Sequence, residues 1–190
     1  MRKLPVSFLA AAAIILIIAL NCENTFEGNA HSYQQVRDNR VEKAIVKSIL
    51  WATDEQILRL AEIIEEKYGS QIKQISRKYL TAPEDIKAIA IVESLTDENS
   101  ESSAGALGLM GVKRTTAKEM GFDDIESPVN NLKAGTKYYK MLLNKFKDRE
   151  LALAAYYLGP GEVGNRLNNG FDPETITYIW KIRRVSRFVI

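Results

Sequence analysis

Residues 81–94 have the sequence TAPEDIKAIAIVES, and the architecture of the chain can be built outward from this segment. Pro83 suits the first turn of a helix, and Thr81 with Glu84 has the spacing of a capping box, so a helix is predicted from here to about Ser94. This helix is apolar nearly all round, which predicts that it is buried. Its apolar residues include Ile86, Ala88, Ile89, Ala90 and Ile91.

Helical periods lie on both sides of this segment, and strand-like alternation is almost absent. A capping box at Thr53 and Gln56 opens one helix, which Gly69 would end, and Ser127 and Asp172 each precede a proline at a helix start. The predicted ranges are 34–51, 53–69, 70–79, 81–94, 127–146 and 151–158, with a last helix starting at residue 172. About seven short helices with short connections indicate a single all-α domain.

The composition is that of an ordinary globular protein, with 46% hydrophobic and 26% charged residues in a chain of 190. Lys and Arg together number 26, and Asp and Glu number 24. Arg2 and Lys3 lie in the N-terminal segment, so the remainder carries 24 charges of each sign. Nucleic-acid binding requires a clustered basic surface, so no nucleic-acid partner is expected.

Cys22 and His31 are the single cysteine and the single histidine. One cysteine forms no internal disulfide, and a Cys/His metal site needs several ligands at motif spacing. His31 lies in a polar stretch outside the expected folded body, which disfavours a hydrolase with a histidine base. We expect a monomer that uses neither a metal ion nor a cofactor.

The N-terminus has the pattern of an export signal, with Arg2 and Lys3 before an apolar run from Leu4 to Leu20. The following Asn21-Cys22 resembles the end of a bacterial lipoprotein signal, in which the cysteine is lipidated. A cleaved secretory signal and an uncleaved anchor are the alternatives, since 17 apolar-rich residues are at the short limit for a membrane span. All three place the remainder outside the cytoplasm, on the periplasmic side of the cell envelope, and the lipoprotein signal or the uncleaved anchor would also hold it to the membrane through a lipid or an apolar segment.

Glu93 differs from the other acidic residues because it closes an apolar helix, directly after Ile91 and Val92. A partly dehydrated carboxyl has a raised pKa, which keeps it protonated near neutral pH and able to donate a proton. The alternative is a helix-end glutamate that hydrogen-bonds loop amides, and local context alone favours that alternative.

Several ordered motifs resemble the lytic transglycosylase domain, a relative of goose-type lysozyme, over about residues 80–185. The first block contains the acid, a serine eight residues after Ser94, and a glycine-rich turn. The second contains an Ala-Leu-Ala-Ala-Tyr helix, a Gly-Pro-Gly turn and a closing Glu-Thr-x-x-Tyr. The matching residues are Glu93-Ser94, Ser102, Gly105-Ala106, Gly108-Leu109-Met110, Thr116-Ala117, Asn131, Gly135, Tyr138-Tyr139, Ala152–Tyr156, Gly159-Pro160-Gly161, Glu174-Thr175 and Tyr178.

The resemblance implies a lysozyme-like helical domain with a groove that binds the glycan strands of peptidoglycan. It implies cleavage of the β-1,4 bond between N-acetylmuramic acid and N-acetylglucosamine with formation of 1,6-anhydro ends, and Glu93 as the single acid and base. It also implies substrate contacts from Ser102, Gly108, Leu109, Met110, Tyr156 and Tyr178. The chain then divides into a signal or anchor (1–22, with Cys22 as the lipidation site), a tether (23–33), N-terminal helices that pack on the domain (34–80) and a catalytic domain (81–190).

Some positions depart from the family pattern. Gly111 stands where a sugar-binding glutamine is usual, Arg114 where proline is usual, and Tyr157-Leu158 where Asn-Ala is usual. The loop after Glu93 is acidic, so like-charge repulsion is expected to raise the pKa of Glu93 further where these carboxylates lie close. These departures leave two alternatives open: a goose-lysozyme-like muramidase, and a catalytically weak peptidoglycan-binding or assembly protein with the same fold. The acidic loop residues are Asp97, Glu98 and Glu101.

Overall fold

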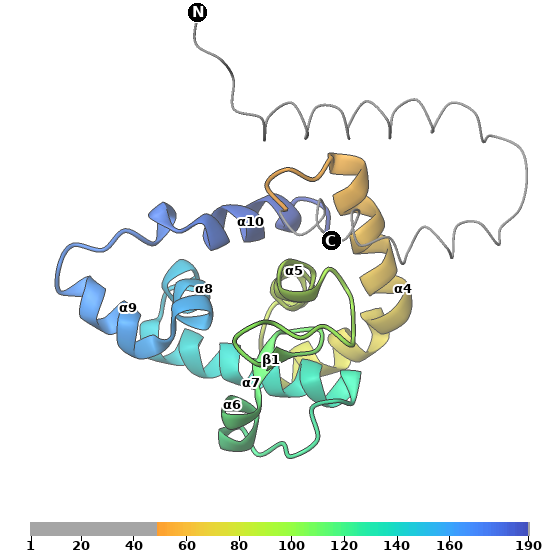
Figure 1. Ribbon diagram of the computed structural model, residues 1–190, viewed down its shortest axis with the longest axis horizontal. Helices are drawn as coiled ribbons and strands as arrows, with labels where there is room; N and C mark the ends of the chain where they lie inside the picture. The colour runs from red at the N-terminus through yellow and green to blue at the C-terminus, as the bar shows by residue number, and fades with distance from the viewer. Residues whose placement is uncertain (1–48, 190) are drawn as a thin grey trace, which may run out of the picture. The chain divides into compact units, whose positions relative to one another are not determined.

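The computed structural model describes residues 49–189, which form helices with one small hairpin (Figure 1). The predicted all-α class is confirmed. The helices are α4 (Asp54–Tyr79), α5 (Pro83–Ser94), α6 (Arg114–Glu119), α7 (Pro128–Phe146), α8 (Arg149–Leu158), α9 (Pro160–Leu167) and α10 (Thr177–Ser186), with a 3₁₀ turn η1 (Pro173–Thr175) and the strands β1 (Ala106–Leu107) and β2 (Val112–Lys113).

Helix α5 lies at the centre of this body, where α4, α7 and α10 pack against it (Figure 1). Ile86 and the four residues from Ala88 to Ile91 are fully buried, which confirms the prediction from the apolar sequence. Burial of each isoleucine side chain contributes about 1.5–3 kcal/mol, so this helix supplies a large part of the apolar core. Because α5 is central, the polar side chains at its two ends, Asp85 and Glu93, lie beside residues of the surrounding helices.

Helix α4 begins as predicted but does not end at Gly69. The capping box is present, because the Thr53 side chain accepts from the Gln56 amide and the Gln56 side chain accepts from the Thr53 amide. The helix then continues to Tyr79, so the predicted break at Gly69 is wrong. Gly69 is buried, and a Cβ there would lie 2.5 Å from Glu65 Oε1. This glycine makes room for a side chain that pairs with Lys87 of α5 at 2.8 Å, so it serves packing rather than helix termination.

The predicted capping box at Thr81 is also wrong. Helix α5 starts at Pro83 with Ala82 as its N-cap and has no side-chain cap. The Thr81 hydroxyl is buried and has no hydrogen-bond partner within residues 49–189. Pro83 has a fixed φ suited to the first helical position, and this sets the helix start without a cap from Thr81.

Several short elements were not predicted. The residues between α5 and α7 form the antiparallel hairpin β1–β2 and the short helix α6. Gly159, with φ of +89°, ends α8 and Pro160 directly begins α9, where only a turn was expected. Asp172 caps the 3₁₀ turn η1 through the Glu174 amide, so α10 starts five residues later than the predicted position. These elements are too short for a hydrophobic period to identify them.

The signal or anchor (1–22), the tether (23–33), Cys22, His31 and the predicted helix up to residue 48 lie outside the described residues. At the start of the described chain, Arg184 of α10 donates to the carbonyls of Ile49, Leu50 and Ala52, which fixes the turn before α4. Within residues 49–189, none of the helices combines the length and the apolarity that a membrane crossing requires.

Candidate active site

Glu93 lies one residue before the end of α5, at a sharp reversal of the chain. Leu95 and Thr96 both adopt left-handed backbone conformations, with φ of +54° and +67°. The Leu95 amide donates to the Ile91 carbonyl and closes the helix. Left-handed conformations are strained for residues with a side chain, so two in succession require support from the surrounding structure. They end α5 immediately after the acid, and Glu93 is held at the boundary between the core and the surface.

The carboxyl of Glu93 is protonated to a substantial extent at neutral pH. Burial raises its pKa from 4.5 to about 7, because removal of water disfavours the charged form. Interactions with the Tyr178 hydroxyl and with the charge of Lys181 act in the opposite direction and lower this pKa. The prediction of a dehydrated carboxyl is consistent with this geometry, and a pKa near neutrality suits a group that must first donate and later accept a proton.

Gly111 forms the surface against which the Glu93 carboxyl lies. Its φ is +56°, and a Cβ at this position would lie 2.6 Å from Glu93 Oε2. Carbon and oxygen atoms cannot approach so closely, so a side chain at residue 111 would displace the carboxyl from its present position. The glycine that replaces the family's glutamine thus affects the acid directly, in addition to any effect on sugar contacts.

Asn131 of α7 holds the turn that leads to Gly111. Its side chain is fully buried, its Oδ1 accepts from the Met110 amide at 2.8 Å, and its Nδ2 donates to the Leu107 carbonyl at 2.8 Å. A Cβ at Gly108 would lie 2.4 Å from Nδ2, so this glycine is needed for the close approach of the turn to α7. The family motifs around Gly108 and Asn131 therefore form one structural unit.

Leu109 and Met110 have fully buried side chains. Met110 packs on Gly135 of α7, where a Cβ would lie 2.7 Å from its sulfur, and its carbonyl accepts from Tyr156 Oη at 2.8 Å. A ligand at this turn would therefore meet its backbone rather than these two side chains. In the structure, Met110 and Tyr156 stabilise the turn. That they also line a substrate groove stays a prediction.

Tyr178 of α10 lies beside the acid. The ring is buried, and its hydroxyl makes no hydrogen bond of ordinary geometry within the described residues. Burial raises the pKa of Tyr178 well above its usual value, and the neighbouring charge of Glu93 adds to the rise. The phenol thus keeps its proton and can donate to a carboxylate or to a sugar oxygen.

Ser102 lies in the hairpin region and is exposed. Its Oγ accepts from the Ala106 amide at 3.0 Å, and the hydrogen bonds of the described residues do not connect it to Glu93. In the acidic loop, Glu98 accepts a hydrogen bond from Tyr68 of α4, and Asp97 accepts from the Asn99 amide. Glu98 and Asp97 thus form hydrogen bonds with α4 and with their own loop. The side chains that act on the pKa of Glu93 are instead those of Tyr178 and Lys181.

Lys181 and the position of Tyr157 were not identified from the sequence as parts of this site. Lys181 lies three residues after Tyr178, so the two occupy the same side of α10, and this spacing is the signal that could have revealed it. Tyr157 stacks on Tyr178 with ring centroids 4.9 Å apart and an angle of 9° between the planes. No periodic pattern within one helix predicts a contact between α8 and α10.

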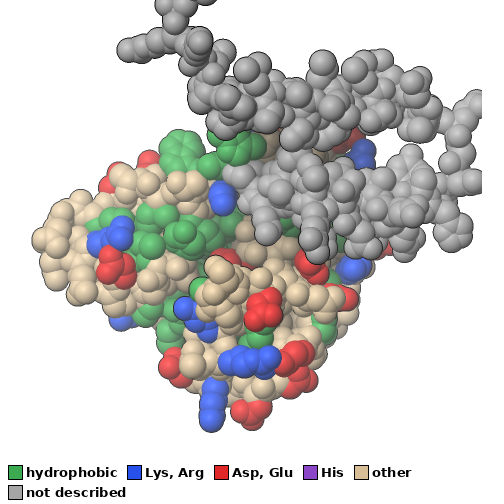
Figure 2. Space-filling view, viewed as in Figure 1, with side chains coloured by type: hydrophobic (Ala, Val, Ile, Leu, Met, Phe, Trp, Pro, Cys, Tyr) green, Lys and Arg blue, Asp and Glu red, His purple; other side chains and the backbone are tan. Residues whose placement is uncertain are grey.

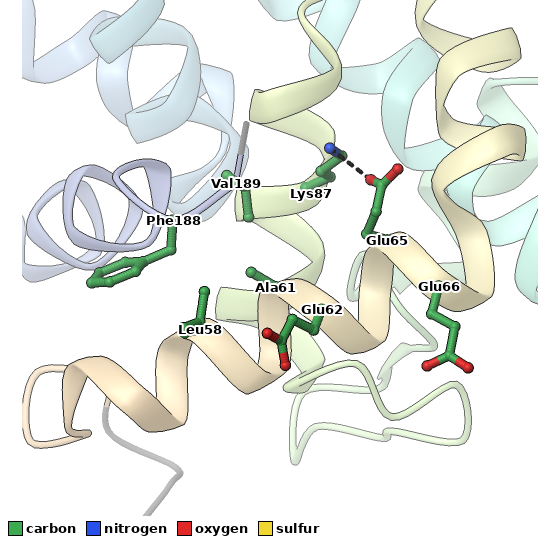
Figure 3. A pocket seen from close by; sticks show the side chains of 8 residues that line it. All are labelled: Leu58, Ala61, Glu62, Glu65, Glu66, Lys87, Phe188 and Val189. Atoms are coloured by element: carbon green, nitrogen blue, oxygen red, sulfur yellow. Dashed lines mark ion pairs between the residues drawn. The ribbon is translucent and has the colours of Figure 1, made fainter.

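Two surface depressions lie elsewhere. A cavity of about 580 Å³ lies between α4, α5 and the C-terminal end, where Lys87 pairs with Glu65 (Figure 3). A second, of about 410 Å³, lies at the hairpin and includes Gly105, Lys113 and Arg114. Glu93 lines neither, so the predicted groove beside the acid stays a prediction. Among residues 49–189, no cluster of three or more His, Cys, Asp or Glu side chains is arranged to bind a metal ion.

Solved structures of lytic transglycosylases share this fold. The 70 kDa soluble lytic transglycosylase of Escherichia coli aligns with a TM-score of 0.59 and 23% identity, over 66% of this chain and 25% of the other. An inactive mutant of the lytic transglycosylase Slt from Pseudomonas aeruginosa aligns with a TM-score of 0.52 and 24% identity, over 65% of this chain and 22% of the other. The helical, lysozyme-like class of the domain is thereby confirmed.

Residues 70–179, more than half of the chain, match the model of the transglycosylase SLT domain. The chain therefore belongs to the transglycosylase SLT domain family, as its motifs predicted.

Curated relatives carry the name membrane-bound lytic murein transglycosylase F. The protein from Cellvibrio japonicus (strain Ueda107) is 35% identical over 85 residues, 41% of this chain and 17% of the relative. The protein from Desulfosudis oleivorans is 36% identical over 99 residues, 46% of this chain and 22% of the relative. The protein from Pasteurella multocida is 30% identical over 146 residues, 58% of this chain and 30% of the relative. The chain thus spans less than a third of the length of these relatives.

Proposed function

We propose that this protein is a lytic transglycosylase that cleaves the glycan strands of peptidoglycan, with Glu93 as its acid and base. The observation that carries the proposal is the carboxyl at the end of α5, whose pKa burial raises to about 7. Membership of the SLT domain family and the names of its relatives support the same activity. A carboxyl whose pKa lies near the working pH is suited to proton transfer.

The proposed reaction breaks the β-1,4 bond between N-acetylmuramic acid and N-acetylglucosamine. Protonated Glu93 donates its proton to the glycosidic oxygen as the bond from that oxygen to the muramic C1 breaks. The resulting carboxylate then removes the proton from the muramic C6 hydroxyl, and the C6 oxygen bonds to C1. The products are a 1,6-anhydro ring and a free N-acetylglucosamine hydroxyl, no water is consumed, and Glu93 regains its proton.

Most glycosidases use two carboxylates, whereas this mechanism requires one group whose pKa lies close to the working pH. Tyr178 would donate to the carboxylate form of Glu93 and stabilise it between the two proton transfers. The backbone of Gly111 lies against the acid, and the turn of residues 108–111 would bind sugar polar groups. Ser102, in the loop before β1, would contact the glycan strand farther from the cleavage point.

We also propose that the protein works in the cell envelope on the periplasmic side, anchored to the membrane by a lipid on Cys22. The apolar run before Cys22 and the membrane-bound names of the relatives support this location. Replacement of Cys22 by Ser should abolish incorporation of labelled fatty acid and release the protein from membranes. Retention of both lipid label and membrane association in the variant would contradict lipidation at this residue.

Glu93→Gln is the direct test of the mechanism, because the amide has nearly the same shape and cannot donate the proton. Digestion of purified sacculi should fall by at least about 100-fold, the lower range for loss of general acid–base catalysis. Glu66→Gln makes the same chemical change at an exposed position of α4 and should keep full activity. Equal digestion by Glu93→Gln and the unmodified protein would remove Glu93 from the mechanism.

Mass spectrometry of the released muropeptides distinguishes the related functions. Products with 1,6-anhydro ends support the transglycosylase. Reducing ends that incorporate oxygen from labelled water would identify a goose-lysozyme-like muramidase, in which water replaces the C6 hydroxyl. Binding to sacculi with no soluble product would identify a glycan-binding or assembly protein, the function that the substitutions at Gly111 and Tyr157 would favour.

A further inference from the structure

The surface over α8 and α10, beside the acid, carries an exposed aromatic side chain. Tyr157, in the last turn of α8, is 58% exposed, and tyrosine is enriched at binding interfaces because it combines a large apolar ring with a polar hydroxyl. Figure 2 shows hydrophobic side chains, in green, gathered on the surface over these two helices. Exposed apolar surface of this kind commonly marks a binding site.

Tyr157 is held in a fixed orientation by its neighbour. One face of its ring lies parallel to the ring of Tyr178, with centroids 4.9 Å apart. Tyr178 is itself buried and interacts with Glu93, so a single ring separates Tyr157 from the acid. A ring supported on one face can present the other face to a ligand without loss of side-chain freedom on binding.

The chemistry of such a face suits a sugar. The face of an aromatic ring carries partial negative charge, and one side of a β-linked pyranose presents C–H groups with partial positive charge. Residue 111, which lies against the acid, is glycine and offers a ligand no side-chain contact. Tyr157 supplies a side-chain surface for the ligand that Gly111 does not.

We propose that Tyr157 is a stacking platform for the N-acetylated sugar next to the bond that Glu93 cleaves, and that it sets the affinity of this chain for glycan. This inference rests on the proposed function of the site. Tyr157 acts in substrate binding and takes no part in proton transfer.

Two substitutions separate stacking from simple coverage of Tyr178. Tyr157→Phe keeps the ring and should bind as the unmodified protein does. Tyr157→Leu still covers Tyr178 with an apolar group but has no aromatic face, and it should bind about tenfold more weakly. Trp51→Ala removes another exposed aromatic, from the turn before α4, and should not change binding.

The measurement is calorimetric titration with the β-1,4-linked tetramer of N-acetylglucosamine, with each variant made in the Glu93→Gln background to prevent cleavage. Kinetics on soluble glycan strands, with Glu93 intact, should show a higher KM for Tyr157→Leu and little change in kcat. Melting temperatures of all variants verify that they are folded.

The possible results are distinct. Equal affinity of the Leu and Phe variants would overturn the platform and leave the proposed function intact. Failure of the unmodified protein both to bind the tetramer and to digest sacculi would reject the proposed function itself. A tenfold loss that is confined to Tyr157→Leu supports the platform.

Discussion

The position of the Glu93 carboxyl depends on the absence of a side chain at residue 111. The Gly111 backbone has φ of +56°, and Glu93 Oε2 occupies the space where a Cβ would lie. The backbone of Gly111 therefore limits where the Glu93 carboxyl can lie, and it is part of the surroundings that bury this carboxyl and raise its pKa.

Gly111→Ala should lower the rate of sacculus digestion by at least about tenfold, because the Cβ displaces the Glu93 carboxyl and a 1 Å displacement of a reacting group can cost about 100-fold. The left-handed backbone should also destabilise the variant by about 1 kcal/mol. Gly121→Ala is the matched control, since its φ is +80° and a Cβ there meets nothing within 4 Å. It should lose similar stability in urea unfolding and keep its activity, and an equal loss of activity in both variants would contradict a specific effect on Glu93.

The proposed mechanism predicts that activity falls as pH rises through about 7, because Glu93 would lose in that range the proton that it is proposed to donate. Lys181 lowers the pKa of Glu93, so Lys181→Met should raise it and move the alkaline side of the pH–activity profile to higher pH. Lys73→Met, on the exposed side of α4, should leave the profile unchanged. Turbidity assays of sacculi between pH 5 and 9 measure this, and a shift to lower pH in Lys181→Met would refute the assignment.

At the scale of elements, the turn between the two strands is built by α7 rather than by its own sequence. Asn131 satisfies the Met110 amide and the carbonyls of Leu107 and Ile125. Gly108 and Gly135 permit the turn and the helix to approach each other. The spacing of these residues in the family motifs is visible in the sequence, but the contacts that join Asn131 to Leu107 and Met110 are tertiary.

Asn131→Leu should destabilise the protein by about 1–3 kcal/mol, because it leaves the buried Met110 amide, the buried Ile125 carbonyl and the partly buried Leu107 carbonyl without this partner. The turn would then no longer hold Gly111 against Glu93, so activity should fall as well. Asn144→Ala, at an exposed position on the same helix, should be close to neutral in both measurements. Urea unfolding followed by circular dichroism gives the comparison, and similar stability of the two variants would disprove the role of Asn131.

Helix boundaries illustrate the same division between local and tertiary causes. The capping box at Thr53 uses groups three residues apart, and it was predicted correctly. Helix α4 continues through Gly69, where the glycine leaves space for the Glu65 side chain, and the pairing of Glu65 with Lys87 of α5 is a tertiary contact that no local pattern contains.

For the whole molecule, the central helix is joined to its neighbours by a buried polar contact. Asp85 at the start of α5 accepts from Arg149 Nε at 2.8 Å and Nη2 at 2.6 Å, from α8, and from Tyr139 Oη at 2.9 Å, from α7. Three helices thus meet at one carboxylate, which is 9% exposed. This contact fixes how α5, and with it Glu93, sits between α7 and α8.

Arg149→Met should lower the free energy of unfolding by about 2 kcal/mol. Removal of one partner of a fully buried ion pair costs about 3–5 kcal/mol, and the partial exposure of Arg149 reduces this. Arg59→Met breaks an exposed ion pair within α4 and should cost less than about 0.5 kcal/mol. Equal stability of the two variants in denaturant unfolding would contradict the proposed role of the Asp85 contact.

The sequence alone predicted the all-α class, the burial of the helix around residues 81–94, the family and the position of Glu93 at the end of that helix. Each of these follows from local periodicity or from ordered motifs, since apolar residues recur on one helix at fixed intervals. Only the tertiary structure showed that Gly111 seats the carboxyl, that Lys181 acts on its pKa, and that Tyr157 stacks on Tyr178. Those relations join residues from different elements of the fold, and their distances are set by packing, about which the periodicity of a single segment carries no information.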